Sequence, residues 1–241
     1  MRKEVIKSLI AIKQSEIPFE VIERDVELPI DRKKIITIPG VRRCGKSTLM
    51  EIAINNLVKG GVARERILWL GFDDERLRNM VSEELDEVIA SYMEMYPDIP
   101  IKDVYMFFDE IQLIKDWEYF VLRLYKTYCK NIYVCGSNAT MLSTELSSAL
   151  RGYPLEYETY PLSFNEYCRF KGITTNCFLE QDKARLRNAF EMYNQESAFP
   201  EIVLTSSKSE QLKLLHSYFD TMLLKDLAEH YKISNTSVVR Y

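Results

Sequence analysis

Apolar residues follow two alternating periods along the chain, and together they predict an α/β fold. Short runs of β-branched and aromatic residues predict buried strands. These runs cover 34–38, 67–70, 104–108 and 131–135. Between the runs, apolar residues return every three or four positions, as they do on one face of a helix. Because strand and helix patterns alternate, the sequence favours a parallel sheet covered by helices.

Four helical segments stand out by their spacing. Residues 2–15 predict a helix with Val5, Leu9 and Ile12 on its apolar side, and a second helix is expected over 48–59. A third carries a stripe that we interpret as core packing, made of Trp117, Phe120, Val121, Leu124 and Tyr128. A fourth is a long amphipathic helix marked by Leu212, Leu215, Phe219, Met222 and Leu223.

Composition narrows the class of protein. The 241 residues are enough for one large domain, or for a main domain with a small one, and 46% apolar with 28% charged residues is typical of globular proteins. A net charge of −4 gives no overall attraction to nucleic acid. No apolar run approaches the roughly 18 residues of a membrane span, and the first residues lack the apolar segment of a signal peptide. We therefore expect a cytoplasmic protein, with no membrane partner and with reduced cysteines.

One stretch departs from both periods and carries the most specific motif. Residues 40–47, GVRRCGKS, match the phosphate-loop pattern G-x-x-x-x-G-K-[ST] at every fixed position. Backbone amides of such a loop and the following helix N-terminus point at phosphate groups. Lys46 is expected to reach the β- and γ-phosphates, and Ser47 to bind Mg²⁺. The candidate nucleotide-binding residues are Gly40, Val41, Arg42, Arg43, Cys44, Gly45, Lys46, Ser47 and Thr48.

Two details of this loop concern its ligand. The chain shows no Asn-Lys-x-Asp motif at a strand end to read guanine, so we expect ATP and ADP rather than guanine nucleotides. Cys44 has two interpretations, a thiol with a pKa lowered by the electropositive loop or a small residue that fills space. Both remain open from the sequence.

An acidic pair follows the third predicted strand. Asp109 would bind Mg²⁺ at the strand end, and Glu110 would be the general base that activates water. Such a pair alone is commonly a solvated turn, but its place after a phosphate loop in an alternating pattern favours catalysis. By contrast, we interpret the acids at 73–75 as a helix cap. Asn138, after the fourth strand, is a candidate sensor of the γ-phosphate or the cap of the next helix.

These motifs together resemble a known family, the prokaryotic AAA-type P-loop ATPases that often carry an additional C-terminal domain. The resemblance covers residues 30–205 and rests on the segments 40–47, 107–112, 136–138, 150–152 and 160–167. It implies a three-layer sandwich around a five-stranded parallel sheet of order 5-1-4-3-2, with residues 155–160 as strand 5, followed by a helical lid. Arg151 matches the family's candidate arginine finger, although an arginine at a helix end also caps carbonyl groups.

Two departures from the family pattern accompany this resemblance. Tyr153 stands where relatives often have an arginine, and residues 197–201 lack the glycines that usually precede Phe-Pro, which leaves the mobility of the lid in question. Arg42 and Arg43 match the family's basic loop. They would offset phosphate charge or bind a neighbouring subunit.

We expect four parts: an N-terminal helix and lead-in (1–30), an ATPase core (31–162), a helical lid (163–208), and an amphipathic helix that begins a C-terminal winged-helix-like domain (209–241). The last part resembles the start of a helix-turn-helix, so we expect the native protein to continue beyond residue 241.

The leading function is ATP hydrolysis that drives conformational change in that C-terminal part or in a protein partner. The alternatives are a slow nucleotide-dependent switch and a DNA-associated motor or loader. Candidate partners are a second copy of the chain, an unidentified protein, and DNA through the C-terminal part alone.

Overall fold

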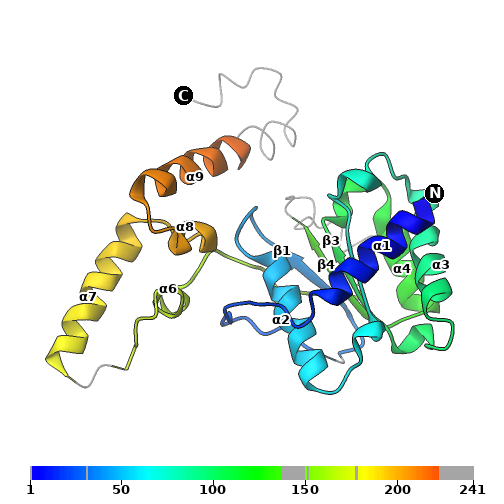
Figure 1. Ribbon diagram of the computed structural model, residues 1–241, viewed down its shortest axis with the longest axis horizontal. Coiled ribbons are helices and arrows are strands. Elements are labelled where there is room, and N and C mark those ends of the chain that lie inside the picture. Colours follow the sequence, from blue (N-terminus) through cyan, green and yellow to red (C-terminus); the bar gives the residue numbers. More distant parts are fainter. Residues whose placement is uncertain (1, 31, 137–149, 151, 177–178, 223–241) are drawn as a thin grey trace. The chain divides into compact units, whose positions relative to one another are not determined.

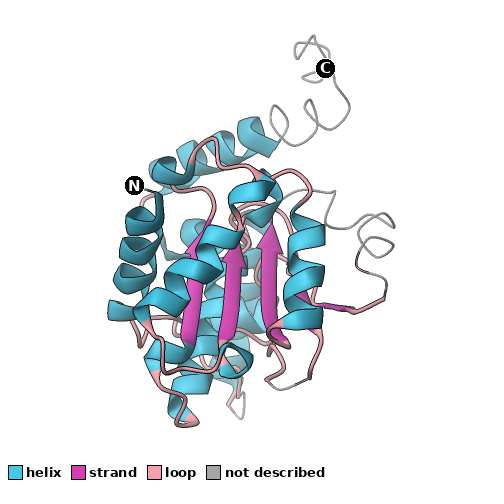
Figure 2. Ribbon diagram, turned by 90° about the vertical axis from the view of Figure 1, so that its right-hand side faces the viewer, coloured by secondary structure: helices cyan, strands magenta, loops and turns pink. Residues whose placement is uncertain are grey.

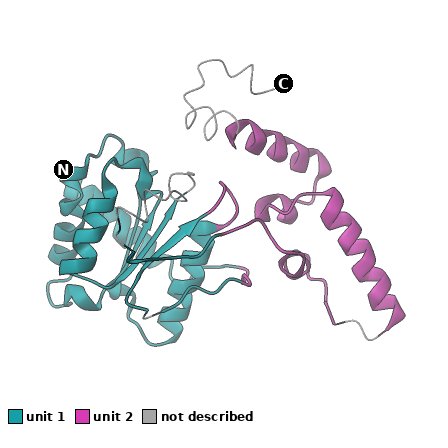
Figure 3. Cartoon of the chain, turned by 180° about the vertical axis from the view of Figure 1, so that it is seen from behind, with its two compact units in different colours: residues 1–21, 26–39, 46–158 teal, residues 22–25, 40–45, 159–241 magenta. Residues whose placement is uncertain are grey.

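The computed structural model describes residues 2–30, 32–136, 150, 152–176 and 179–222 (Figure 1). The chain divides into two units, which Figure 3 distinguishes by colour. The first unit comprises residues 1–21, 26–39 and 46–158. The second comprises residues 22–25, 40–45 and 159–241. Each unit is thus assembled from stretches that are separate in sequence, and the boundary between Gly45 and Lys46 runs through the phosphate-loop motif.

The first unit is built around a parallel sheet. Its strands are β1 (Ile35–Pro39), β2 (Ile67–Gly71), β3 (Tyr105–Asp109), β4 (Asn131–Gly136) and β5 (Pro154–Glu156). They lie in the order β2-β3-β4-β1-β5, with every neighbouring pair parallel. This is the order 5-1-4-3-2 read from the opposite edge, so the expected topology is confirmed. In such a sheet all strands end at one edge, where the acidic pair and the phosphate loop also follow their strands.

The fifth strand is shorter than expected and begins earlier. It runs over Pro154–Glu156 instead of 155–160. As an edge strand it has one neighbour, β1, and its first residue is a proline without an N–H group. After the strand, the Tyr157 N–H still donates to the Thr37 carbonyl oxygen at 2.8 Å. The regular ladder therefore ends at Glu156, and beyond it this hydrogen bond and an isolated parallel bridge between Gly40 and Thr159 follow.

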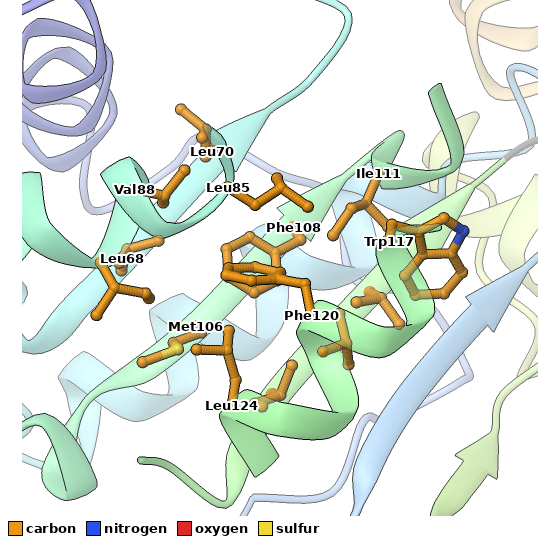
Figure 4. Close-up of a cluster of buried hydrophobic side chains, with 14 of the residues drawn as sticks. Leu68, Leu70, Leu85, Val88, Met106, Phe108, Ile111, Trp117, Phe120 and Leu124 are labelled. Atoms are coloured by element: carbon orange, nitrogen blue, oxygen red, sulfur yellow. The ribbon is translucent and has the colours of Figure 1, made fainter. Parts of the chain in front are cut away.

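Helices of the described part of the first unit cover the two faces of the sheet, which gives three layers (Figure 2). They are α1 (Arg2–Ser15), α2 (Lys46–Lys59), α3 (Asp86–Met95) and α4 (Trp117–Thr127). Alternate residues of a strand point to opposite faces. On one face, Leu68 and Leu70 of β2 and Phe108 of β3 pack with residues of α3 and α4, as Figure 4 shows. On the other, Trp69 and Phe107 join a second apolar cluster that includes α2 residues.

Two apolar stripes differ in detail from the sequence prediction. In α1 the fully buried residues are Ile6 and Ile10, whereas Ile12 is 46% exposed. The buried stripe continues to Gln14, whose amide donates to the Ile67 carbonyl at 2.7 Å, so a polar residue occupies a core position. In α4 the predicted stripe is buried except for Tyr128, which lies beyond the end of the helix and is 37% exposed.

The second unit is helical. Its helices among the described residues are α6 (Phe164–Phe170), α7 (Glu180–Gln195), α8 (Pro200–Leu204) and α9 (Lys208–Thr221). A small core of Leu162, Tyr167 and Val203 holds α6 and α8 together. In α9 the buried residue is Tyr218, while the predicted apolar residues Leu212, Leu215 and Phe219 are 40–59% exposed. The expected helix-turn-helix at 227–240 lies outside the described residues.

Among the described helices, none is both long and apolar enough to cross a membrane.

Candidate nucleotide-binding site

The phosphate loop connects the end of β1 to the start of α2. Its backbone enters the left-handed region twice, at Arg43 with φ of 63° and at Gly45 with φ of 99°. The Cys44 N–H donates to the Val41 carbonyl oxygen at 3.4 Å, which closes a tight turn inside the loop. Turns that include left-handed residues can direct successive N–H groups to one concave side, where an anion binds.

Both glycines of the motif are also needed for packing inside the second unit. A Cβ atom on Gly40 would lie 2.3 Å from the Thr159 carbonyl oxygen. A Cβ atom on Gly45 would lie 2.7 Å from Nη1 of Arg24. The sequence prediction assigned these glycines to wrapping a triphosphate. The structure adds that the loop packs closely against Arg24 and Thr159.

Arg24 lies against this loop, and no sequence pattern pointed to it. Its guanidinium donates to the Cys44 carbonyl at 2.8 Å and to the Tyr160 carbonyl at 2.9 Å. It also forms an ion pair with Glu166, with Nε 2.7 Å from Oε1. Glu166 lies in the 160–167 segment that the family resemblance singled out, and Ser163 with Glu166 makes the capping box of α6. The capping pattern was readable from the sequence, but its ion pair with Arg24 was not.

In the first unit, the start of α2, which follows the loop, contacts the end of β3, which carries the acidic pair. The Ser47 hydroxyl donates to the carboxylate of Asp109, the last residue of β3, and Sγ of Cys135 donates to the same carboxylate at 2.6 Å. Burial raises the pKa of Asp109, the charges of Glu110 and Asp73 raise it further, and the two hydrogen bonds oppose this shift. Burial and the adjacent Asp109 charge hold the pKa of the Cys135 thiol well above its usual value, so it remains a donor.

Glu110 follows in an unusual backbone conformation. Its φ is 51° and its ψ 33°, a left-handed geometry that is uncommon for residues other than glycine and is often found at functional sites. Nε2 of Gln112 donates to the Glu110 carboxylate. Oε1 of the same Gln112 is buried and has no hydrogen-bond partner among the described residues. Gln112 therefore restricts the orientation of the candidate general base.

A cavity of about 390 Å³ lies beside the Asp109 carboxylate in the first unit, and its lining includes Ser47, Asp109 and Asp73. Asp74 also lines it, and its side chain accepts from the Arg76 N–H at the start of a short 3-10 helix (Glu75–Leu77). The interpretation of the acids at 73–75 as a cap therefore holds for Asp74. Asp73 instead adds negative charge near Asp109.

The remaining predicted site residues are placed as follows. Lys46 is the first residue of α2 and is buried, and Thr48 lies in the same helical turn. Val41 is exposed at the loop surface, and Cys44 is buried. Arg43 forms an ion pair with Glu201 at 2.7 Å. Asn138 and Arg151 lie outside the described residues.

The donor set fits a magnesium nucleotide. Ser47 and Asp109 present hard oxygen ligands within one hydrogen bond of each other, and Mg²⁺ prefers oxygen ligands. The loop is bent at a left-handed glycine whose position leaves no room for a side chain. Both features match what a phosphate loop requires.

Comparison with known proteins agrees with this geometry. A family model described as an AAA domain matches residues 32–168, which is more than half of the chain. The chain belongs to the AAA domain family. Membership indicates that this AAA domain is a nucleotide-binding ATPase domain.

Curated relatives of this AAA domain are longer proteins. An uncharacterized protein of Methanocaldococcus jannaschii, MJ1544, is 32% identical over 223 residues, which are 92% of the chain and 48% of that protein. An uncharacterized protein of Haemophilus influenzae is 30% identical over 210 residues, 87% of the chain and 50% of that protein. The chain thus spans about half the length of these relatives. Among solved structures, C. elegans PCH-2 aligns with 90% of the chain and 68% of its own, at 14% identity and a TM-score of 0.37.

Proposed function

We propose that this AAA domain binds MgATP through residues 40–48 and hydrolyses it, and that hydrolysis drives conformational change in an attached C-terminal part or a protein partner. The observation that carries the proposal is the hydrogen bond from Ser47 to Asp109. It joins the last residue of the phosphate-loop motif, in the first turn of α2, to the acidic end of β3, and this pairing is what Mg²⁺ binding between a loop hydroxyl and a strand-end aspartate requires.

Each residue has a defined task in this proposal. The loop amides and Lys46 hold the phosphates, while Ser47 and Asp109 hold Mg²⁺, which neutralises charge that develops on the phosphate oxygens. Glu110 accepts a proton from the attacking water, and Gln112 orients its carboxylate. Asn138 as γ-phosphate sensor and Arg151 as arginine finger remain part of the proposal.

Glu110→Gln tests the assignment of the general base. The amide cannot accept the proton, so we expect hydrolysis to fall by at least about 100-fold, while MgATP affinity changes little. Phosphate release and fluorescent-nucleotide binding measure the two quantities. Glu83→Gln, an exposed change in the same unit, is the control and should leave both unchanged. Turnover of Glu110→Gln equal to that of the wild type contradicts the assignment.

A contact inside the second unit supports a slow molecular switch as a second candidate. Arg43 of the loop pairs with Glu201 of α8 and stacks over the Tyr218 ring of α9, with Cζ 4.7 Å from the ring centroid. Arg43 and Glu201 are about half exposed, so this ion pair is weak and a phosphate group can compete for the guanidinium. Nucleotide bound at the loop would thereby change the contacts of Arg43 with α8 and α9. These helices lie within or next to the proposed lid (163–208).

Turnover measurements separate the two candidates. A motor hydrolyses repeatedly and its rate rises with its partner or C-terminal part, whereas a switch remains in the ATP-bound state for long periods. Single-turnover and steady-state rates of the chain, measured with and without the proposed C-terminal part, give this distinction.

A further inference from the structure

Arg24 lies far from the phosphate-loop motif in sequence, yet its guanidinium binds the carbonyl of Cys44 inside that motif at 2.8 Å. We propose that Arg24 is a positioning residue for nucleotide binding: by holding the Cys44 carbonyl, it sets the direction of the Gly45 N–H group toward the phosphates. The inference rests on the proposed function and adds a residue outside the motif to it.

Peptide geometry connects the two groups. The Cys44 carbonyl and the Gly45 N–H belong to one peptide unit, which is planar and trans. Their bonds therefore point in opposite directions, and fixing the oxygen also fixes the hydrogen. Gly45, with φ of 99°, would otherwise have the widest conformational freedom in the loop because it lacks a side chain. The guanidinium removes that freedom at the amide on which phosphate binding depends.

A charged donor at the carbonyl also changes the strength of the amide. A hydrogen bond to the oxygen of a peptide polarises the whole unit, so its N–H becomes a stronger donor. Hydrogen bonds from an ionised group are about twice as strong as neutral ones. Arg24 therefore both orients and strengthens the Gly45 donor.

The guanidinium of Arg24 is held in one orientation by its partners. Its side chain is 3% exposed, and a buried charge is costly unless it is paired and fully hydrogen-bonded. Glu166 supplies the opposite charge through two contacts, at 2.7 and 3.3 Å. The Tyr160 carbonyl takes a further N–H at 2.9 Å. With these partners the guanidinium has little freedom to turn, so the Cys44 carbonyl is held by a rigid group.

A purely structural role is the competing explanation, and the chain offers a matched control for it. Arg169 also ties the 22–25 segment to α6, by donating to the Glu23 carbonyl and to Asp25, each at 2.7 Å. Both contacts of Arg169 are with the 22–25 segment, and the hydrogen bond to the Cys44 carbonyl belongs to Arg24. Arg169→Gln therefore loosens the same segment while it leaves that loop contact intact.

The first test measures MgADP and MgATP affinity with a fluorescent nucleotide. We expect Arg24→Gln to weaken both by about 10- to 100-fold, the effect of losing a charge-assisted hydrogen bond and the order it imposes. Arg169→Gln should bind within about twofold of the wild type. Equal losses in the two variants overturn the inference, because loosening of the segment then explains the result. If Arg24→Gln does not fold, as judged by thermal unfolding, Arg24→Lys replaces it with an expected loss of about 3- to 10-fold, since one ammonium cannot reach all three partners.

The second test observes the peptide unit itself. Cys-Gly occurs in the chain only at 44–45 and 135–136, so labelling cysteine carbonyls with ¹³C and glycine nitrogens with ¹⁵N yields two correlated NMR signals. Without nucleotide, Arg24→Gln should move the Gly45 signal and leave the Gly136 signal in place. A Gly45 signal that does not move overturns the inference.

Lys46→Ala in the binding assay separates this inference from the proposed function. If the wild-type chain binds no nucleotide, the proposed function is overturned and the inference with it. The same holds if Lys46→Ala leaves nucleotide affinity unchanged. Binding that depends on Lys46 and not on Arg24 overturns the inference alone.

Discussion

Glu166 shows how a single carboxylate can remain charged with almost no solvent around it. Its side chain is 4% exposed. Burial by itself raises the pKa of Glu166, but the hydrogen bonds from Arg24 and from the N–H groups of Asp25 and Ser163 outweigh burial and lower it. The folded-state pKa therefore lies below the ordinary value of 4.5. The ionised form is the one that stabilises the fold.

This shift predicts a pH-dependent stability. A carboxyl group whose pKa is lowered by folding stabilises the protein fully above its unfolded pKa, and the contribution is lost as the pH falls through the folded pKa. We expect Glu166→Gln to lower the free energy of unfolding by about 3 kcal/mol at pH 7. Below about pH 4.5 the difference from the wild type should shrink, because Glu166 becomes protonated.

Urea denaturation at pH 7, 5, 4 and 3 checks this prediction. Glu180→Gln is the control, because Glu180 forms an exposed ion pair with Lys183, and its loss should cost under about 0.5 kcal/mol. A difference between the wild type and Glu166→Gln that stays constant down to pH 3 contradicts the assigned pKa direction.

At the scale of elements, α1 provides a matched pair of isoleucines. Ile10 is fully buried and Ile12 is 46% exposed, although both lie in the same helix. Truncation of a buried isoleucine removes apolar contacts and leaves a cavity, so Ile10→Ala should cost about 2 to 5 kcal/mol. Ile12→Ala should cost under about 1 kcal/mol. Thermal or urea unfolding measures the free energy of unfolding of both variants. Similar losses of stability would contradict the assignment of Ile10 to the buried face and Ile12 to the exposed face of α1.

The elements also show what local pattern can and cannot predict. The first four strands, β1 to β4, and α2 were predicted to within about two residues, because β-branched runs and helical spacing are local signals. In α1 the predicted residues Val5 and Leu9 pack partly buried against the core. Only Ile12 was wrongly placed, because the polar Gln14 continues the buried stripe in its stead. β5 was misplaced because an edge strand of three residues, two of them exposed, has no hydrophobic period.

The candidate site was predictable where chemistry follows a motif. The phosphate loop and Asp109-Glu110 were read directly from the sequence, and the structure brings Ser47 to Asp109. The contact of Arg24 with Glu166 joins residues separated by 142 positions, and no local period reports such a pair. Supporting residues of this kind become visible only when the segments are folded together.

At the scale of the whole molecule, the two units are interleaved along the chain. The chain passes between them at 21/22, 25/26, 39/40, 45/46 and 158/159. The helical unit thus includes two short N-terminal segments, one with Arg24 and one with the phosphate loop. A piece that begins at residue 159 contains Glu166 without its cationic partner.

Because the helical unit is assembled from three separate segments, its C-terminal segment alone should be unstable. We expect residues 159–241 expressed alone to lack cooperative thermal unfolding, since Glu166 would be buried without Arg24 and the Thr159 carbonyl would lose Gly40 beside it. Circular dichroism during heating measures this, with the full chain as reference. Sharp unfolding of the fragment at the full chain's melting temperature would show that the 22–25 and 40–45 segments are dispensable.

The same interleaving limits how such a helical unit can be exchanged between proteins. A graft of one continuous cassette would leave behind the arginine that neutralises its buried acid. Recombination, or an engineer who builds a chimera, would have to transfer three separate pieces of chain together, or replace Glu166 at the same time.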